Sequence, residues 1–219
     1  MKVAVLFFDY QRHEHSLQAL TSVINAGTQF DLFTINRKGI AAAFNEGIAK
    51  TANYDYIAFC SNDITMQPHW LSKAIHALNT IPDIGTIGFH CVEGLQPHEE
   101  INGIMVHPTF TSFGNMVISR KVIDHVGRFN EEYDPYGMQD ADYAYRLNCL
   151  GYKNYYLYDV KSEHIGADVG SGTEYRAMKD EGLSKASKVW EKWKAIYDAP
   201  EYLINQKQMY GEDKRFWFE

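Results

Sequence analysis

The chain has 219 residues, of which 45% are hydrophobic and 14% aromatic, so it is long enough to bury a substantial core. One α/β domain is the default expectation for a chain of this size. The formal net charge of −7 argues against a nucleic-acid-binding protein, which would present a basic face. The charge is compatible with an anionic small-molecule ligand, because a metal ion can supply positive charge locally.

Cysteine content and the N-terminal residues bear on the cellular compartment. The three cysteines, Cys60, Cys91 and Cys149, have no metal-binding spacing, and their odd number does not suggest a disulfide framework. The apolar run at 3–8 is too short for the core of a signal peptide, and no run approaches the roughly 20 residues that span a bilayer. The sequence therefore predicts a cytoplasmic protein without a transmembrane segment.

The first half of the chain alternates strands and helices. Apolar runs predict four strands, at Val3–Phe8, Phe30–Ile35, Tyr56–Cys60 and Ile84–Phe89. Helical spacing of apolar residues predicts three helices between them, at Ser16–Ala26, Gly39–Thr51 and Pro68–Leu78. This order predicts parallel strands joined by right-handed crossovers, and hence a Rossmann-like first half.

The alternation breaks after His90. Residues 91–114 hold scattered Gly, Pro and His and are predicted to be an irregular segment or a short β excursion. The later predicted elements are strands at Asn115–Ser119 and Tyr155–Tyr158 and helices at Lys121–Val126, Asp140–Leu150 and Glu174–Tyr197. We expect one domain at 1–199, followed by a C-terminal tail at 200–219.

Asp63 comes directly after the apolar strand Tyr56–Cys60 and the polar pair Ser61-Asn62. In open α/β sheets, ligands bind at the carboxyl ends of the strands, so this carboxylate is a candidate metal ligand. Mg²⁺ and Mn²⁺ prefer hard oxygen ligands and are usually held by one or two carboxylates together with substrate phosphates. The alternative is that Asp63 caps the helix that follows.

Asp140 and Asp142 open a predicted helix. The helix macrodipole alone favours acids in the first turn, so a structural role is open for both residues. Asp140, however, follows the loop Tyr133-Asp134-Pro135-Tyr136-Gly137, whose composition is typical of ligand binding. A carboxylate held there is a candidate general base that takes a proton from a sugar hydroxyl, a step worth ~10²–10⁴ in rate.

His164 ends a later predicted strand and precedes a glycine-rich loop at 166–172. A lone histidine at a strand end is commonly a structural hydrogen-bonding residue, but such a loop can close over phosphates. Together with Asp63 and Asp140, His164 becomes a candidate metal ligand. Two carboxylates and an imidazole at three element ends predict a divalent metal ion beside a general base, as in group transfer from a phosphate.

Several segments, taken in order, resemble the GT-A glycosyltransferases, specifically the large inverting family 2 group. Residues 36–47 resemble that family's Asn-x-Gly…Ala-x-Asn-x-Gly helix, which precedes the strand into its Asp-x-Asp motif. Residues 126–133 resemble its Gly-x-Phe-Asp-Glu loop. Residues 139–147 resemble its Glu-Asp-x-Asp-Leu…Arg helix, and Gly151-Tyr152-Lys153 continues the pattern. The resemblance spans roughly residues 3–197.

The resemblance implies the GT-A fold, with a mixed, mainly parallel central sheet flanked by helices. It implies a nucleotide-binding half at 1–90 and an acceptor and catalytic half at 91–199. It implies transfer of a hexose, with inversion, from a nucleotide-sugar donor to a hydroxyl of a glycan or other acceptor. UDP is the expected carrier by family habit. Mn²⁺ or Mg²⁺ would sit on the diphosphate, held by Asp63 and His164, and Asp140 would be the catalytic base.

The resemblance also implies which residues bind the donor. Phe8, Asp9 and Tyr10, at the end of the first strand, would lie beside the nucleobase. The nucleotide would further be approached by Asn36, Arg37, Asn45 and Asn62.

The chain also departs from the family pattern. Ser61 and Gln139 replace residues that are usually acidic, and a Val-Asp-Asn-Gly-Ser segment after the second strand is missing. One alternative is therefore a non-catalytic nucleotide-sugar or glycan-binding domain on the same fold. A sugar nucleotidyltransferase is a second alternative, but it should carry a Gly-rich basic loop where this chain has residues 9–13. The aromatic tail around Trp217 leaves peripheral membrane contact open.

Overall fold

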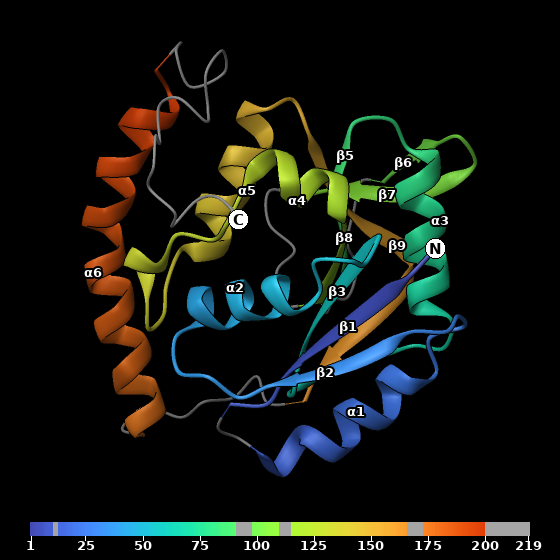
Figure 1. Cartoon of the computed structure of the whole chain (residues 1–219), viewed down its shortest axis with the longest axis horizontal. Coiled ribbons are helices and arrows are strands. Elements are labelled where there is room, and N and C mark those ends of the chain that lie inside the picture. The colour runs from blue at the N-terminus through green and yellow to red at the C-terminus, as the bar shows by residue number, and fades with distance from the viewer. Residues whose placement is uncertain (11–12, 91–97, 110–114, 166–172, 200–219) are drawn as a thin grey trace.

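The computed structural model describes residues 1–10, 13–90, 98–109, 115–165 and 173–199, which form a mixed α/β fold (Figure 1). The strands are β1 (Val3–Phe8), β2 (Asp31–Ile35), β3 (Tyr56–Ser61), β4 (Ile64–Met66), β5 (Ile84–His90), β6 (Glu99–Ile101), β7 (Ile104–Pro108), β8 (Asn115–Ser119) and β9 (Lys153–His164). The helices are α1 (Ser16–Ile24), α2 (Ile40–Lys50), α3 (Trp70–Thr80), α4 (Arg120–Val126), α5 (Gln139–Cys149) and α6 (Glu174–Tyr197), with 3-10 turns η1 (His13–His15) and η2 (Glu131–Tyr133). Cys91, the loop at 166–172 and the tail at 200–219 lie outside the described residues.

The strands follow the order β2-β1-β3-β8-β5-β9-β7-β6, and β4 pairs with β9 off this path. β1 is parallel to both β2 and β3, and β5 is parallel to β9. β8 is antiparallel to both of its neighbours. The predicted α/β class, a mixed sheet flanked by helices, is confirmed. The first four predicted strands are nevertheless not one continuous parallel set, because β8 lies between β3 and β5.

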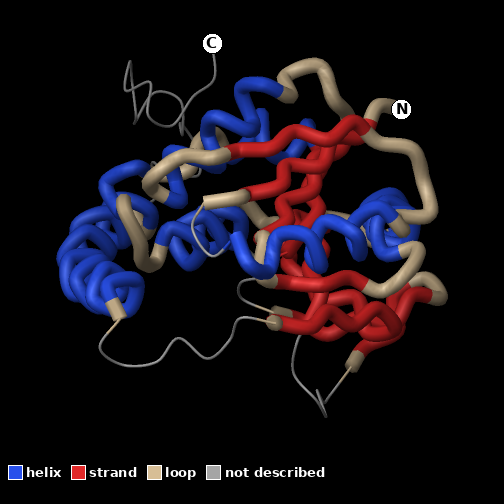
Figure 2. Tube along the Cα trace, turned by 90° about the horizontal axis from the view of Figure 1, so that it is seen from below, coloured by secondary structure: helices blue, strands red, loops and turns tan. Residues whose placement is uncertain are grey.

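The central strands are covered on both faces, and helices lie on both sides of them (Figure 2). Successive strand residues point to opposite faces of a sheet. Val5 and Phe7 of β1 accordingly belong to a core formed with α1 and α3, whereas Leu6 belongs to a second core formed with α2, α4 and α5. Burial on both faces explains why this strand is uniformly apolar in sequence.

Two parts of the sheet differ from the sequence-based expectation. β4 was not predicted, and β9 is longer than the strand predicted at Tyr155–Tyr158. The two differences are linked, because β4 pairs with the last residues of β9 in an antiparallel register. Within the region predicted to be irregular or a short β excursion, β6 and β7 form an antiparallel pair. The full length of β9 matters most, because the strand ends at His164, which the sequence had placed at a strand end.

Helix α6 stands at the edge of the molecule, beyond α5 and away from the sheet (Figure 1). Its C-terminal end packs on α5, where the Tyr197 hydroxyl donates to the Asp142 carboxylate at 2.7 Å. Trp193 Nε1 donates to Glu132 in η2 at 3.1 Å. The helix is therefore attached to the segment that leads into α5. None of the helices in the described part of the chain is long and apolar enough to cross a membrane.

Candidate active site

The pairing of β4 with β9 brings Asp63 next to His164. Asp63 lies in the turn between β3 and β4, and Ile64 is the register partner of His164. The Ile165 amide extends this ladder by donating to the Asp63 carbonyl at 2.9 Å. As a result, His164 Nε2 lies 3.0 Å from Asp63 Oδ2. The alternative in which Asp63 caps the following helix is wrong, because α3 begins only at Trp70.

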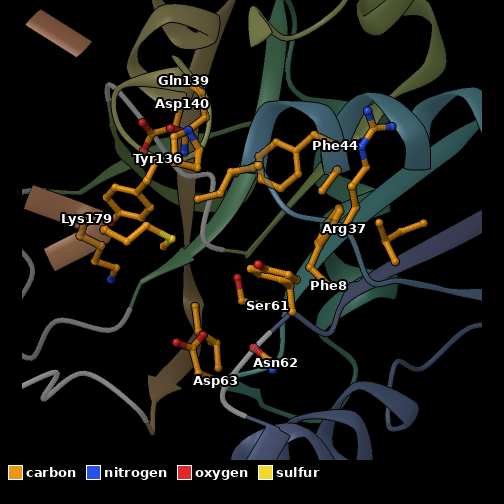
Figure 3. A pocket seen from close by; sticks show the side chains of 18 of the residues that line it. Phe8, Arg37, Phe44, Ser61, Asn62, Asp63, Tyr136, Gln139, Asp140 and Lys179 are labelled. Carbon is orange, nitrogen blue, oxygen red and sulfur yellow. The ribbon is translucent and has the colours of Figure 1, made fainter. Parts of the chain in front are cut away.

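A cavity of about 430 Å³ brings the predicted chemical groups together (Figure 3). Asp63, His164 and Asp140 all line it, although they come from the β3–β4 turn, the end of β9 and the start of α5. The cavity also receives residues from the ends of β1 and β2 and from α2 and α6. It therefore lies at the carboxyl ends of the first parallel strands, where open α/β sheets bind ligands.

The predicted nucleotide-binding residues divide into two groups. Phe8, Tyr10, Arg37 and Asn62 line the cavity. The residues not among its lining are Asp9, Asn36 and Asn45. The structure therefore brings the first group, with the aromatic rings of Phe8 and Tyr10, to the same cavity as the candidate catalytic groups.

Asp9 organises one wall of the cavity from behind. Its carboxylate accepts hydrogen bonds from the Ser16 hydroxyl at 2.6 Å and from the Asn62 amide at 3.1 Å, and it lies 2.8 Å from His13 Nδ1. Partial burial opposes ionisation of Asp9, but these bonds outweigh burial and together lower its pKa. Asp9 thus holds Asn62, the neighbour of Asp63, against the start of α1.

Asn45 is buried inside the protein rather than at the cavity. Its amide nitrogen donates to the Phe129 carbonyl at 2.9 Å and to Glu131 at 2.8 Å. Its amide oxygen accepts from the Phe129 N–H at 2.8 Å. Only 2% of the residue is exposed. Sequence reasoning placed Asn45 near the nucleotide, whereas the structure commits its side chain to joining α2 to the loop at 127–131.

The loop before α5 is fixed on the N-terminus of α2. The Asp134 carboxylate accepts from the Ala41 and Ala42 amides at 2.9 and 3.1 Å, so it satisfies two otherwise unpaired amides of the helix start. Burial raises the pKa of Asp134, and the two amide bonds oppose that rise. Gly39, at φ +90°, leaves room for this contact, because a Cβ there would come within 2.7 Å of the carboxylate. The loop that leads into Asp140 is therefore tied to the α2 side of the cavity.

Asp140 and Asp142 have different environments although they are two residues apart. Asp142 is fully buried, with Arg146 Nε at 3.0 Å and the Tyr197 hydroxyl at 2.7 Å. Arg146 in turn donates to the carbonyls of Val126 and Arg128. Asp140 is half-buried and lines the cavity. Asp142 therefore has a structural role, and Asp140 is the carboxylate that a ligand can reach.

Several residues that were not predicted as site residues also line the cavity, among them Phe44, Tyr136 and Lys179. The Tyr136 ring lies 4.9 Å below Lys179 Nζ. Burial raises the pKa of the Tyr136 hydroxyl, and the nearby charges of Asp140 and Asp63 raise it further against an opposing effect of Arg176. Tyr136 belongs to a loop whose composition suggested ligand binding. Lys179 carried no signal, because one lysine among several on a long amphipathic helix looks like a solvated residue.

The pair formed by Asp63 and His164 fits part of a site for a divalent metal ion. A carboxylate oxygen and an imidazole nitrogen 3.0 Å apart, both at the cavity, can act as neighbouring ligands of one ion. No group of three or more His, Cys, Asp or Glu side chains among the described residues is arranged to hold a metal. An ion bound here would therefore complete its coordination with ligand phosphates or water, as Mg²⁺ commonly does.

The sequence profile described as glycosyl transferase family 2 matches residues 9–130, more than half of the chain. The chain belongs to glycosyl transferase family 2. No curated protein matches the chain. The family match runs from the residue after β1 to the loop after α4, so Asp140, His164 and α6 of this family 2 protein lie beyond the matched residues.

Solved structures similar to this family 2 protein share its GT-A fold. GalNAc-T7 with UDP, GalNAc and Mn²⁺ superimposes with a TM-score of 0.64 at 12% identity, over 99% of this chain and 55% of that one. The catalytic domain of Drosophila β1,4-galactosyltransferase 7 in complex with xylobiose gives 0.55 at 17% identity, over 81% and 78% of the two chains. S. aureus TarS 1–349 gives 0.53 at 14%, over 73% and 58%. The chain thus spans about half the length of the GalNAc-T7 chain.

Proposed function

We propose that this glycosyl transferase is a metal-dependent, inverting enzyme. It moves a hexose from a nucleotide-sugar donor, with UDP as the expected carrier, to a hydroxyl of a glycan or another acceptor. The observation that carries the proposal is the convergence of Asp63, His164 and Asp140 on one cavity. Membership of family 2 supports the transfer of a sugar. Two similar structures support the choice of donor and metal. GalNAc-T7 was crystallised with UDP and Mn²⁺, and a Drosophila galactosyltransferase was crystallised with manganese and UDP-Gal.

In this proposal Asp63 and His164 would hold Mn²⁺ or Mg²⁺ together with the diphosphate of the donor. When bound, such an ion neutralises negative charge on phosphate oxygens. The Ser61-Asn62-Asp63 segment contributes one carboxylate, and Asn62 is held in place by Asp9. The protein therefore depends on Asp63 for the negative charge that attracts the ion to this end of the cavity.

Asp140 is the proposed general base. Its carboxylate takes the proton of the acceptor hydroxyl while that oxygen forms a bond to the anomeric carbon of the sugar. The bond between the anomeric carbon and the β-phosphate oxygen breaks at the same time, and its electron pair leaves with the nucleoside diphosphate. Attack from the face opposite the leaving group inverts the anomeric centre. A positioned base of this kind contributes ~10²–10⁴ in rate.

The nucleoside is proposed to lie at the other end of the cavity. Phe8 and Tyr10 come from the end of β1, and Phe44 comes from α2. The Phe8 and Phe44 rings pack edge to face, with centroids 4.8 Å apart, and form an apolar wall against which a base can lie. Arg37 lines the same end and lies 3.5 Å from Glu46, so it can donate to a ligand while its charge is partly balanced.

A non-catalytic nucleotide-sugar or glycan-binding domain is the second candidate function. The replacement of usually acidic residues by Ser61 and Gln139 favours it. The Gln139 amide oxygen accepts from the Gly137 N–H at 2.9 Å, so this side chain shapes the loop rather than holding a metal. The retention of both Asp63 and Asp140 at the cavity favours the enzyme. A sugar nucleotidyltransferase has no support beyond its related fold.

The experiment that tests the proposal measures release of nucleoside diphosphate from a panel of nucleotide sugars, with Mn²⁺, with Mg²⁺ and with EDTA. We expect at least one donor to be turned over with a metal ion present and none in EDTA. Donor binding without release, unchanged in Asp140→Asn, would instead favour the binding domain. A thermal-shift screen of the same panel identifies the donor first, because a ligand that binds the folded state raises the unfolding temperature.

A further inference from the structure

Lys179 places a positive charge on the wall of the cavity that holds the two candidate catalytic carboxylates. Its Nζ lies 4.9 Å from the centroid of the Tyr136 ring, and both residues line the cavity. Tyr136 lines the same cavity as Asp140 and Asp63. Figure 3 shows Lys179 and Tyr136 on one side of the cavity, between Asp140 and Asp63 in that view. Lys179 therefore stands at the end of the cavity where the sugar would be transferred.

The packing of α6 fixes Lys179 in this position. Lys179, Gly182 and Ala186 follow one another at spacings of three and four residues, which places them on one face of the helix. Gly182 touches the backbone of Tyr136, where a Cβ would overlap the Tyr136 carbonyl oxygen. Ala186 approaches Gly137 on the same side, because a Cβ on Gly137 would lie 3.3 Å from the Ala186 Cβ. The helix face that carries Lys179 is thus in direct backbone contact with the loop before Asp140.

The lysine and arginine side chains that line the cavity, within the described part of the chain, are Arg37 and Lys179. Arg37 lies at the nucleoside end, beside Glu46. Lys179 lies at the other end, where an incoming diphosphate would meet the negative charges of Asp63 and Asp140. Cleavage of the sugar–phosphate bond adds further negative charge to the β-phosphate, in a partly enclosed site where a fixed cation is more effective than in water. The distribution of charge in the cavity therefore favours binding of an anionic ligand by Lys179.

We infer, on the basis of the proposed function, that Lys179 binds the diphosphate of the nucleotide-sugar donor and stabilises the departing nucleoside diphosphate. The bond between the anomeric carbon and the β-phosphate oxygen breaks, and its electron pair stays on that oxygen. Lys179 keeps its proton throughout and acts through its charge. Tyr136 is a positioning residue, because its ring supports the ammonium group in a cation–π contact. The wall that supplies this charge comes from α6, beyond the residues that match the family.

The test measures binding of nucleoside diphosphates by calorimetry in Mn²⁺, using UDP, GDP, CDP and ADP with the wild type and then the tightest of them with the variants. We expect Lys179→Met to weaken binding about 10- to 100-fold, the range expected for loss of a charge-assisted hydrogen bond. Lys179→Arg keeps the charge and should bind within about threefold of the wild type. Lys188→Met is the matched control, since Lys188 is an exposed lysine on the same helix, and it should bind like the wild type. The nucleoside without phosphates should bind the wild type and Lys179→Met equally.

The outcomes separate this inference from the proposed function. If the wild type binds none of the four diphosphates, the proposed function fails. If the wild type binds one of them and Lys179→Met binds it equally well, the proposed function stands and the inference is overturned. If Lys179→Met raises only the KM for the acceptor, the inference is also overturned, because Lys179 would then contact the acceptor and not the diphosphate. Thermal unfolding checks that Lys179→Met is folded, and Lys179→Gln provides a second neutral variant for the same comparison.

Discussion

Asp63 and His164 are 101 residues apart in the chain, yet Oδ2 of the carboxylate and Nε2 of the imidazole lie within 3.0 Å of each other. The three-residue strand β4 accounts for this proximity, because it places Ile64 opposite His164 in an antiparallel ladder. The backbone, rather than the two side chains alone, therefore sets the spacing of the candidate metal ligands. Pre-set spacing of this kind lets a site bind an ion without first reorganising.

Asp63→Asn and His164→Ala should remove the dependence of donor binding on metal. In the wild type we expect Mn²⁺ to strengthen binding of UDP relative to EDTA. Mutation of residues that merely hydrogen-bond to metal ligands typically lowers metal affinity about 10- to 100-fold. Loss of a direct ligand should therefore remove most of the increase in UDP affinity that Mn²⁺ gives. The measurement is calorimetry of UDP with Mn²⁺ and with EDTA. Asp159→Asn is the control, because Asp159 is exposed and paired with Lys73 away from this cavity. Tight UDP binding by the wild type in excess EDTA would contradict the metal role.

Asp140→Asn should reduce turnover by ~10² or more while donor binding stays nearly unchanged. The substitution keeps the size of the side chain and removes the proton acceptor, so the loss should appear in kcat and not in the dissociation constant of the donor. Steady-state kinetics and calorimetry on the same preparation measure the two quantities. An unchanged kcat would exclude Asp140 as the base.

Asp142→Asn should lower the free energy of unfolding, in contrast to the loss of turnover expected for Asp140→Asn. Asp142 is fully buried, and the substitution removes its negative charge. The buried Arg146 guanidinium is then left without its carboxylate partner. Breaking a buried ion pair from one side costs about 3–5 kcal/mol. Urea unfolding measures this loss in free energy, with Asp140→Asn as the matched control that should unfold close to the wild type. Equal unfolding free energies in the two variants would contradict the separate roles assigned to these two acids.

Local sequence patterns predicted most of the elements but not how they assemble around the site. The strand at Val3–Phe8 and the helix at Glu174–Tyr197 have the predicted bounds, because buried runs and helical spacing are local signals. β4 was missed because three residues after a turn are too few to show a period. The insertion of β8 between β3 and β5 depends on contacts between distant segments, which no local pattern reports.

The same limit applies to single residues of the site. Asp63, Asp140 and His164 line one cavity, and the sequence singled them out because two carboxylates and an imidazole at three element ends are together suited to metal binding and base catalysis. Asn45 was placed at the nucleotide from its position in a motif, whereas its amide pairs with the backbone of Phe129. Lys179 was missed because its role depends on which face of α6 meets the loop before Asp140, and that face is set by tertiary packing.

Asp9 should make stability depend on pH in the acid range. Hydrogen bonds from Ser16, His13 and Asn62 lower its pKa below that of the unfolded chain, which is near 3.9. Its contribution to stability is therefore fully present above the unfolded pKa and is lost as the pH falls through the folded pKa. The unfolding free energy of the wild type minus that of Asp9→Asn should shrink as the pH is lowered from about 5.5 towards about 2.5. Urea unfolding at several pH values measures this difference. A difference that stays constant over the range would show that Asp9 does not titrate with a lowered pKa.

Gly182→Ala should destabilise the protein and reduce turnover, although alanine is the better helix former. In an exposed helix interior the substitution would stabilise by about 0.8–1.0 kcal/mol. At Gly182 the added Cβ overlaps the backbone carbonyl of Tyr136, which cannot rotate away, so α6 or the loop has to move. Overpacking of this kind costs about 1–3 kcal/mol, which exceeds the gain in helix propensity. The shift also displaces Lys179 and Tyr136 together. Urea unfolding and kcat are measured beside Ser184→Ala, an exposed position on the same helix, where we expect no loss in either quantity. Higher stability of Gly182→Ala would mean that the close contact between α6 and the loop does not exist in solution.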